Sequence, residues 1–133
     1  MPVAERFLDT NVLLYLLSGD SDHADRAERE VAAGGVVSVQ VLNEFAAAAV
    51  RKARMPVADV QEVLGAVRTT CECVPLTVET HDAGLALAGK HHLPVYDAMI
   101  VAAAQLAGCR LLLSEDFNDG QRFGQLVVRN PFR

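Results

Sequence analysis

Four acidic residues of this sequence have the types and positions that a cation-binding site needs. They are Asp9, Glu44, Asp97 and Asp116. Two carboxylates about 4 Å apart repel each other by roughly 4 kcal/mol at an effective dielectric constant of about 20, so four that meet must attract cations or protons. Oxygen ligands without histidine or thiolate partners favour Mg²⁺ or Mn²⁺ over zinc. Two such ions about 4 Å apart hydrolyse phosphodiester bonds, because they generate hydroxide and stabilise the leaving oxygen.

Two of the acids follow predicted strands. Asp9 ends a strand at residues 7–8, and Asp116 comes soon after an apolar strand at residues 111–113. Ligands of open parallel sheets bind beyond the carboxyl ends of the strands, so these two side chains are expected at one edge. Two ordinary roles stay open, because Asp9 could cap the helix that follows it and Asp116 could be a turn residue.

The other two acids lie on predicted helices with apolar neighbours. Glu44 shares a helix face with the apolar residues expected to turn toward the core, where an unpaired carboxylate costs on the order of several kcal/mol. Asp97 precedes the apolar stretch 98–104, which indicates that its helix is buried. An exposed Glu44, or one paired with Arg51, remains an alternative, and Asp97 could simply interact with the helix dipole.

Alternating strand and helix patterns predict a single α/β domain over residues 1–133 that positions these acids. Strands are expected at residues 7–8, 36–39, 73–76, 111–113 and 126–128, and helices at 11–17, 20–33, 40–54, 56–70, 77–90 and 94–107. Because helices separate most successive strands, the connections must cross over the sheet. The prediction is a three-layer α/β/α sandwich with a central, mainly parallel sheet of four to five strands.

The segments around the acids resemble the motifs of PIN-domain proteins. The four segments are FLDTN at 7–11, LNEF at 42–45, YDAMI at 96–100 and LSEDF at 113–117. Each motif is common by itself, but the four stand in the order of that family and cover nearly the whole chain. The size of the chain makes it most similar to the VapC-type ribonuclease toxins of toxin–antitoxin pairs.

This resemblance implies a PIN-like fold and a Mg²⁺-dependent endoribonuclease, with Mn²⁺ as a substitute, that hydrolyses RNA phosphodiester bonds. Asp9 and Asp97 would be the main metal ligands, and Glu44 and Asp116 would complete the catalytic set around one or two ions. Glu44 would orient the attacking water or act as general base. The resemblance also implies a cognate antitoxin that blocks the acidic pocket, and a homodimer.

Three further polar residues would support the acids. Asn11 would hydrogen-bond to the first acid, and Ser114 occupies the position of a small hydroxyl residue before the last one. Three acids, Glu115, Asp116 and Asp119, are available to complete the site. The family pattern Ser-x-Asp favours Asp116, and Asp119 is kept as a supporting candidate.

Two other functions remain open on the sequence. One is a non-catalytic module in which the acids hold a structural metal or a partner. The other is an aspartyl-phosphate phosphatase or receiver domain. That class needs a second Asp two residues after the first, where this chain has Asn11, and a lysine at a strand end. Both lysines, Lys52 and Lys90, fall on predicted helices or at their ends instead.

The net charge of −5 argues at first against a nucleic-acid partner. Setting aside the four site acids leaves 13 of the 17 acidic residues against 12 basic ones, so the excess lies largely in the predicted metal site. Ten of the 12 basic residues are arginines, which suit phosphate contact, although composition bias explains that ratio equally well. The arginines to examine for RNA contact are Arg51, Arg54, Arg110, Arg122 and Arg129.

The remaining signals predict a cytoplasmic protein. The three cysteines, Cys71, Cys73 and Cys109, have neither an even number for a disulfide framework nor the spacing of a zinc site. Residues 1–6 lack the pattern of a secretory signal, and no apolar stretch approaches the ~20 residues of a membrane span. We therefore expect no membrane partner.

Overall fold

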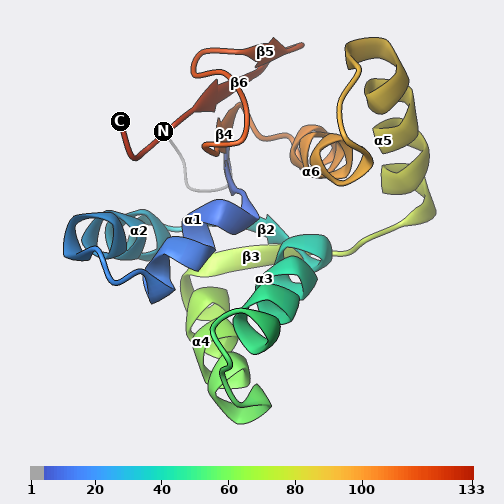
Figure 1. Cartoon of the computed structure of the whole chain (residues 1–133). Helices are drawn as coiled ribbons and strands as arrows, with labels where there is room; N and C mark the ends of the chain where they lie inside the picture. The colour runs from blue at the N-terminus through green and yellow to red at the C-terminus, as the bar shows by residue number, and fades with distance from the viewer. Residues whose placement is uncertain (1–4) are drawn as a thin grey trace.

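The computed structural model describes residues 5–133, in which six strands form one sheet in the order β3-β2-β1-β4-β6-β5 (Figure 1). Residues 1–4, part of the segment inspected for a signal sequence, lie outside this range. The strands are β1 (Arg6–Leu8), β2 (Gly35–Ser38), β3 (Cys71–Val74), β4 (Leu111–Leu113), β5 (Arg122–Phe123) and β6 (Leu126–Arg129). All neighbouring strands are parallel except β5 and β6. The predicted mainly parallel sheet is confirmed, with six strands in the described chain instead of four to five.

Helices cover both faces of this sheet. They are α1 (Thr10–Leu14), the 3₁₀ helix η2 (Tyr15–Leu17), α2 (Ser21–Ala33), α3 (Val39–Arg51), α4 (Val57–Thr70), α5 (Val78–His91) and α6 (Val95–Leu106). Helices α1 to α4 pack together on one side, and the pair α5 and α6 lies on the other, which confirms the α/β/α sandwich (Figure 1). Right-handed crossovers require this, since β1 to β3 progress in one direction and the chain then returns to β4.

Helix caps explain most differences from the predicted boundaries. Ser38, the last residue of β2, accepts a hydrogen bond from the backbone N–H of Val41 and caps α3, so Val39, predicted in the strand, begins the helix instead. Helix α3 ends at Arg51 instead of residue 54, because Arg54 adopts a left-handed conformation (φ 55°) before Pro56. The predicted strand 73–76 was placed two residues too late, since β3 follows α4 without a loop and ends before Pro75.

Two further predictions were incomplete near the ends of the sheet. The apolar run 11–17 is not one helix, because α1 tightens into η2 at Tyr15. The two-residue strand β5 is not predicted from the sequence, because it is very short and the turn residues Asn118 to Gly120 and Gly124 flank it. It pairs antiparallel with β6 and extends the sheet past the last predicted strand.

The core fixes α6, the helix that carries Asp97. Its residues from Ala98 to Ala104 are all buried between the sheet and α5. Gly84 of α5 faces Met99, and a Cβ atom at that glycine would overlap the Met99 side chain. The absence of a side chain at Gly84 therefore allows the two helices to approach closely.

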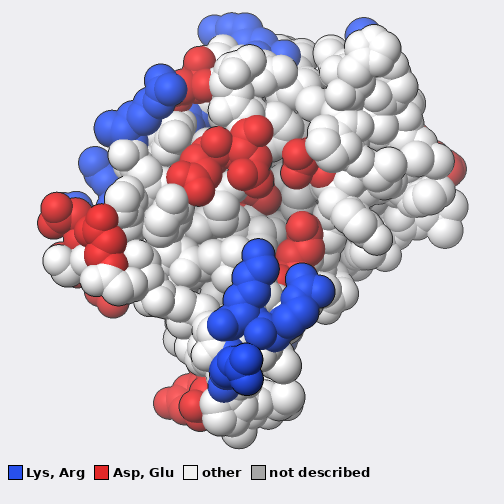
Figure 2. Space-filling model, in the orientation of Figure 1, with Lys and Arg blue, Asp and Glu red and all other residues white. Residues whose placement is uncertain are grey.

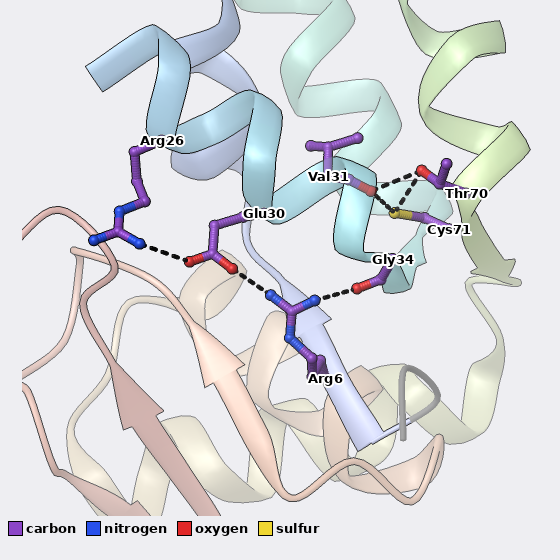
Figure 3. A network of polar contacts seen from close by, with 7 residues as sticks. All are labelled: Arg6, Arg26, Glu30, Val31, Gly34, Thr70 and Cys71. Carbon is purple, nitrogen blue, oxygen red and sulfur yellow. Dashed lines mark hydrogen bonds and ion pairs between the residues drawn. The ribbon is translucent and has the colours of Figure 1, made fainter. Parts of the chain in front are cut away.

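A network of polar contacts stabilises the amino-terminal edge of the sheet (Figure 3). The guanidinium of Arg6, a residue only 7% exposed at the start of β1, donates to the carbonyl of Gly34 and to Glu30 Oε1, both at 2.5 Å. Nearby, the hydroxyl of Thr70 donates to the carbonyl of Val31 at 2.8 Å. These contacts join the end of α2 to β1 and to the end of α4.

The structure also bears on the cysteines and on membrane-spanning helices. Cys71, Cys73 and Cys109 form no disulfide within the described residues; Cys71 and Cys109 are buried, and burial raises the pKa of all three thiols. Between residues 5 and 133 the structure has no helix with the length and apolar character that crossing a membrane requires.

Candidate active site

The carboxyl ends of β1 and β4 bring Asp9 beside Ser114. The two strands are parallel and pair Leu8 with Leu113, so the residues that follow them are neighbours. The backbone N–H of Asp9 donates to the carbonyl of Leu113 at 3.0 Å, and the Ser114 hydroxyl donates to Asp9 Oδ2 at 2.7 Å. Strand order reverses between β1 and β4, which is the position where ligands bind in doubly wound sheets.

Asp9 is a buried carboxylate with neutral hydrogen-bond donors. It is 3% exposed, and its Oδ1 accepts from the backbone N–H of Thr10 at 2.7 Å. Its Oδ2 accepts from Ser114 and, at 3.4 Å, from the amide nitrogen of Asn11. Asp9 therefore is the N-cap of α1, the ordinary role left open by the sequence, and its other oxygen faces the turn after β4.

The surroundings of Asp9 disfavour its charged form. Desolvation by burial raises its pKa from 3.8 to about 7, against the opposing hydrogen bonds from Ser114 and Thr10. The charges of Asp116 and Asp97 raise it further. The three aspartates are thus electrostatic neighbours, although they lie just after β1, in α6 and in the turn after β4.

Ser114 and Asn11 hold that turn in place. The Ser114 hydroxyl, fully buried, accepts from the Asn11 amide nitrogen at 3.2 Å and from the backbone N–H of Asp116 at 3.0 Å. The Asn11 side-chain oxygen accepts from the backbone N–H of Glu115 at 3.3 Å. Both residues therefore fix the backbone that carries Asp116 relative to Asp9.

Asp97 and Glu44 approach from the two helical layers. Asp97 lies in the first turn of α6, and desolvation followed by the charges of Asp116 and Glu44 raises its pKa. Glu44 on α3 is half-buried and accepts from Gln40 Nε2 at 3.1 Å and from the Thr10 hydroxyl at 3.5 Å. The structure thus places all four predicted acids at one edge of the sheet.

Sequence reasoning missed Gln40 and Thr10. Gln40 is 6% exposed, and its amide nitrogen also donates to the carbonyl of Tyr96 at 3.0 Å, next to Asp97. It therefore links Glu44 on α3 to the start of α6. The available signal was its spacing, since a residue four positions before Glu44 shares its helix face.

The other two acids after β4 lie differently. Glu115 is exposed, and its carboxylate accepts from the Tyr15 hydroxyl at 2.8 and 3.0 Å. Asp119, also exposed, accepts from the backbone N–H of Asn130 at 2.8 Å and so anchors the C-terminal segment. Of the three acids in question, Asp116 is the one whose charge raises the pKa of Asp9 and Asp97.

The donor set fits a hard divalent cation in its chemistry. It consists of four carboxylates, two of which have raised pKa values, and in residues 5–133 none of the four forms an ion pair. A Mg²⁺ or Mn²⁺ ion would relieve their repulsion and is suited to oxygen ligands. As the side chains stand, no three His, Cys, Asp or Glu residues of the described chain are grouped to hold one ion. Coordination would therefore require the side chains of Glu44, Asp97 and Asp116 to move toward the buried Asp9.

Figure 2 shows how charged side chains are distributed on the face that carries the site. Acidic side chains gather at the middle of this face, around α1, the start of α6 and the middle of α3. A compact basic group lies below them, over the carboxyl end of α3.

Comparisons with known proteins agree with this fold. Residues 6–121 match the model of the PIN domain family. No curated protein matches the chain in sequence. Several solved structures share its fold, and three of them are compared with this chain. A toxin–antitoxin complex from Klebsiella pneumoniae has 22% identity and a TM-score of 0.71, covering 95% of this chain and 97% of that one. VapC20 of Mycobacterium tuberculosis, a sarcin–ricin loop cleaving toxin, has 19% identity and a TM-score of 0.65, with coverages of 84% and 91%. VapBC2 from Rickettsia felis, bound to a DNA fragment from its promoter, has 16% identity and a TM-score of 0.68, with coverages of 94% and 97%.

Proposed function

The chain belongs to the PIN domain family, and from this premise we propose that it is a Mg²⁺- or Mn²⁺-dependent endoribonuclease. We further propose that it is the VapC-type toxin of a type II toxin–antitoxin pair. The similar structures include a toxin–antitoxin complex and a toxin that cleaves the sarcin–ricin loop, which supports both statements. An RNA substrate, a cognate antitoxin, a homodimer and a cytoplasmic location belong to the same proposal.

The observation that carries the proposal is the buried Asp9, surrounded by like charges. A carboxylate that is 3% exposed and has two aspartates as electrostatic neighbours is costly for folding alone. Acids with perturbed pKa values cluster at functional sites, which supports the proposal. Their place at the switch point of the sheet gives the same indication.

The residues of the site would have distinct roles in metal binding and in the orientation of the water. Asp9, Asp97, Glu44 and Asp116 would hold the metal, which when bound supplies an activated water and neutralises phosphate charge. Ser114 and Asn11 fix the Asp9 carboxylate by hydrogen bonds. Gln40 and Thr10 donate to Glu44 and hold it in a defined orientation, in which it can orient a water or accept its proton.

RNA cleavage with mapped ends tests this proposal. The native chain should cut RNA in Mg²⁺ and Mn²⁺ but not in a chelator, whereas Asp97→Asn should lose the activity and keep the fold. Asp59→Asn is the matched control, since Asp59 is an exposed acid in the first turn of α4.

Two results would contradict the proposal. Cleavage by purified Asp97→Asn at the native rate would remove Asp97 from the site. A native chain that binds Mn²⁺ but cuts no member of an RNA panel would instead indicate a non-catalytic metal-binding module.

A further inference from the structure

Three exposed basic residues stand close together at the carboxyl end of α3. Arg51 lies in the last turn of the helix, Lys52 is its C-cap, and Arg54 follows in the turn before α4. We call these three residues the α3 basic cluster. It lies directly beside the acidic side chains on the same face of the molecule (Figure 2).

The helix geometry aligns this cluster with the candidate active site. Arg51 follows Glu44 by seven residues, which is nearly two full turns, so both side chains leave α3 on the same face. Seven residues of α-helix are about 10 Å long. A chain of phosphates that passes Glu44 along α3 therefore reaches Arg51.

The cluster has no charge partner of its own in the described part of the chain. The ion pairs among residues 5–133 involve Arg6, Arg26 and His23, and none includes Arg51, Lys52 or Arg54. The helix dipole accounts for a basic residue in the last turn, where Arg51 lies. It does not account for two more positive charges within the next three residues, which repel each other and Arg51.

We propose that the α3 basic cluster binds backbone phosphates of the RNA whose scissile bond lies at the acidic site. This inference rests on the proposed function and deepens it, because it gives the RNA strand a path along α3. Arginine forks bind phosphate through two parallel hydrogen bonds, and lysine adds a compact positive charge. The acids alone would repel RNA, so a neighbouring basic surface is required to hold the substrate strand there.

The test measures RNA binding separately from cleavage. A fluorescein-labelled, mixed-sequence, single-stranded 20-nucleotide RNA is titrated by anisotropy with the full chain carrying Asp97→Asn, in Mg²⁺. Adding Arg51→Gln and Arg54→Gln should raise Kd roughly 25-fold at about 0.1 M salt, the contribution of two single-strand phosphate contacts. The slope of log Kd against log salt should fall by about 1.4.

Matched variants distinguish the effect of the position of these charges on RNA binding from the effect of the total charge of the chain. Arg29→Gln with Arg68→Gln removes the same charge from exposed sites on α2 and α4, near the opposite edge of the sheet, and should leave Kd and the slope unchanged. Arg51→Lys with Arg54→Lys should retain the slope and lose only part of the affinity, since lysine keeps the charge without the fork.

Two outcomes would overturn the inference. One is that the Arg51→Gln/Arg54→Gln pair and the Arg29→Gln/Arg68→Gln pair lose the same affinity for RNA, or that neither pair loses any. The other is displacement of the RNA by a 20-residue polyglutamate as effectively as by unlabelled RNA, which would assign the cluster to an acidic polypeptide. Cleavage by the native chain decides the proposed function independently, so the two failures are distinguishable.

Discussion

The two ends of β1 place opposite charges in very different surroundings. Arg6 at its start is 7% exposed, and Asp9 just after its end is 3% exposed. Arg6 has an acidic partner in Glu30 and a carbonyl acceptor in Gly34 (Figure 3). Asp9 has only neutral donors as hydrogen-bond partners, and its charged neighbours are aspartates.

The charges at the two ends of this three-residue strand therefore differ in whether the fold itself compensates them. The ion pair at the amino-terminal edge compensates the desolvation of Arg6 within the fold itself. At the carboxyl-terminal edge the compensation is incomplete, and only a bound cation or proton can supply the rest. The charge at the amino-terminal edge is thus compensated within the fold, and the proposed metal site lies at the edge where it is not.

Removal of the Arg6 side-chain charge should have the largest effect on folding. Arg6→Met leaves Glu30 with only the longer 4.0 Å contact to Arg26 and leaves the carbonyl of Gly34 without its donor, so the free energy of unfolding should fall by about 3 to 5 kcal/mol. Urea denaturation monitored by circular dichroism measures this, and RNA cleavage per folded molecule should stay native. A loss well below 1 kcal/mol would mean that the pair does not stabilise the fold.

The pH dependence of the free energy of unfolding should reveal the titration of the Asp9 carboxyl group. Its pKa is about 7 in the folded chain and near 3.8 when unfolded, so the folded state holds the extra proton between these values. Stability in a chelator should therefore fall as pH rises from 4 to 7, by up to about 4 kcal/mol from this group. Asp9→Asn should flatten that part of the curve; a native-like slope in the variant would assign the titration to another group.

Metal should stabilise the native chain through the same acids. At 100 times its Kd, Mg²⁺ raises the free energy of unfolding by about 2.7 kcal/mol if it binds the folded state alone. Thermal unfolding with and without Mg²⁺ should show this shift for the native chain and for Asp59→Asn. An equally large shift in Asp97→Asn would place the ion elsewhere.

The smallest effect is expected for Asp97→Asn in the absence of metal. The substitution relieves repulsion from Asp116 and Glu44 at a half-exposed site, so it should stabilise the chain by no more than about 1 kcal/mol. Urea denaturation in a chelator is the measurement, with Asp59→Asn as reference. Destabilisation by Asp97→Asn would show that the helix dipole outweighs this repulsion.

The sequence by itself determined the features that depend on neighbouring residues. The apolar strand at 111–113, the helix that ends before residue 71 and the mainly parallel order of the sheet follow from local pattern and connection length. The four acids were identified in the same way, because each stands at an element boundary or on an apolar helix face.

Only the tertiary structure decided which side chains contact one another and which charged residues have a neutralising partner. Ser114 reaches Asp9 across 105 residues and Arg6 reaches Glu30 across 24, and no local pattern records such pairs. Gln40 gains its second acceptor, the carbonyl of Tyr96, only when α3 and α6 approach the same edge of the sheet. Burial and electrostatic partners are properties of the packed chain, so the satisfied charge of Arg6 and the unsatisfied charge of Asp9 became distinguishable only in the fold.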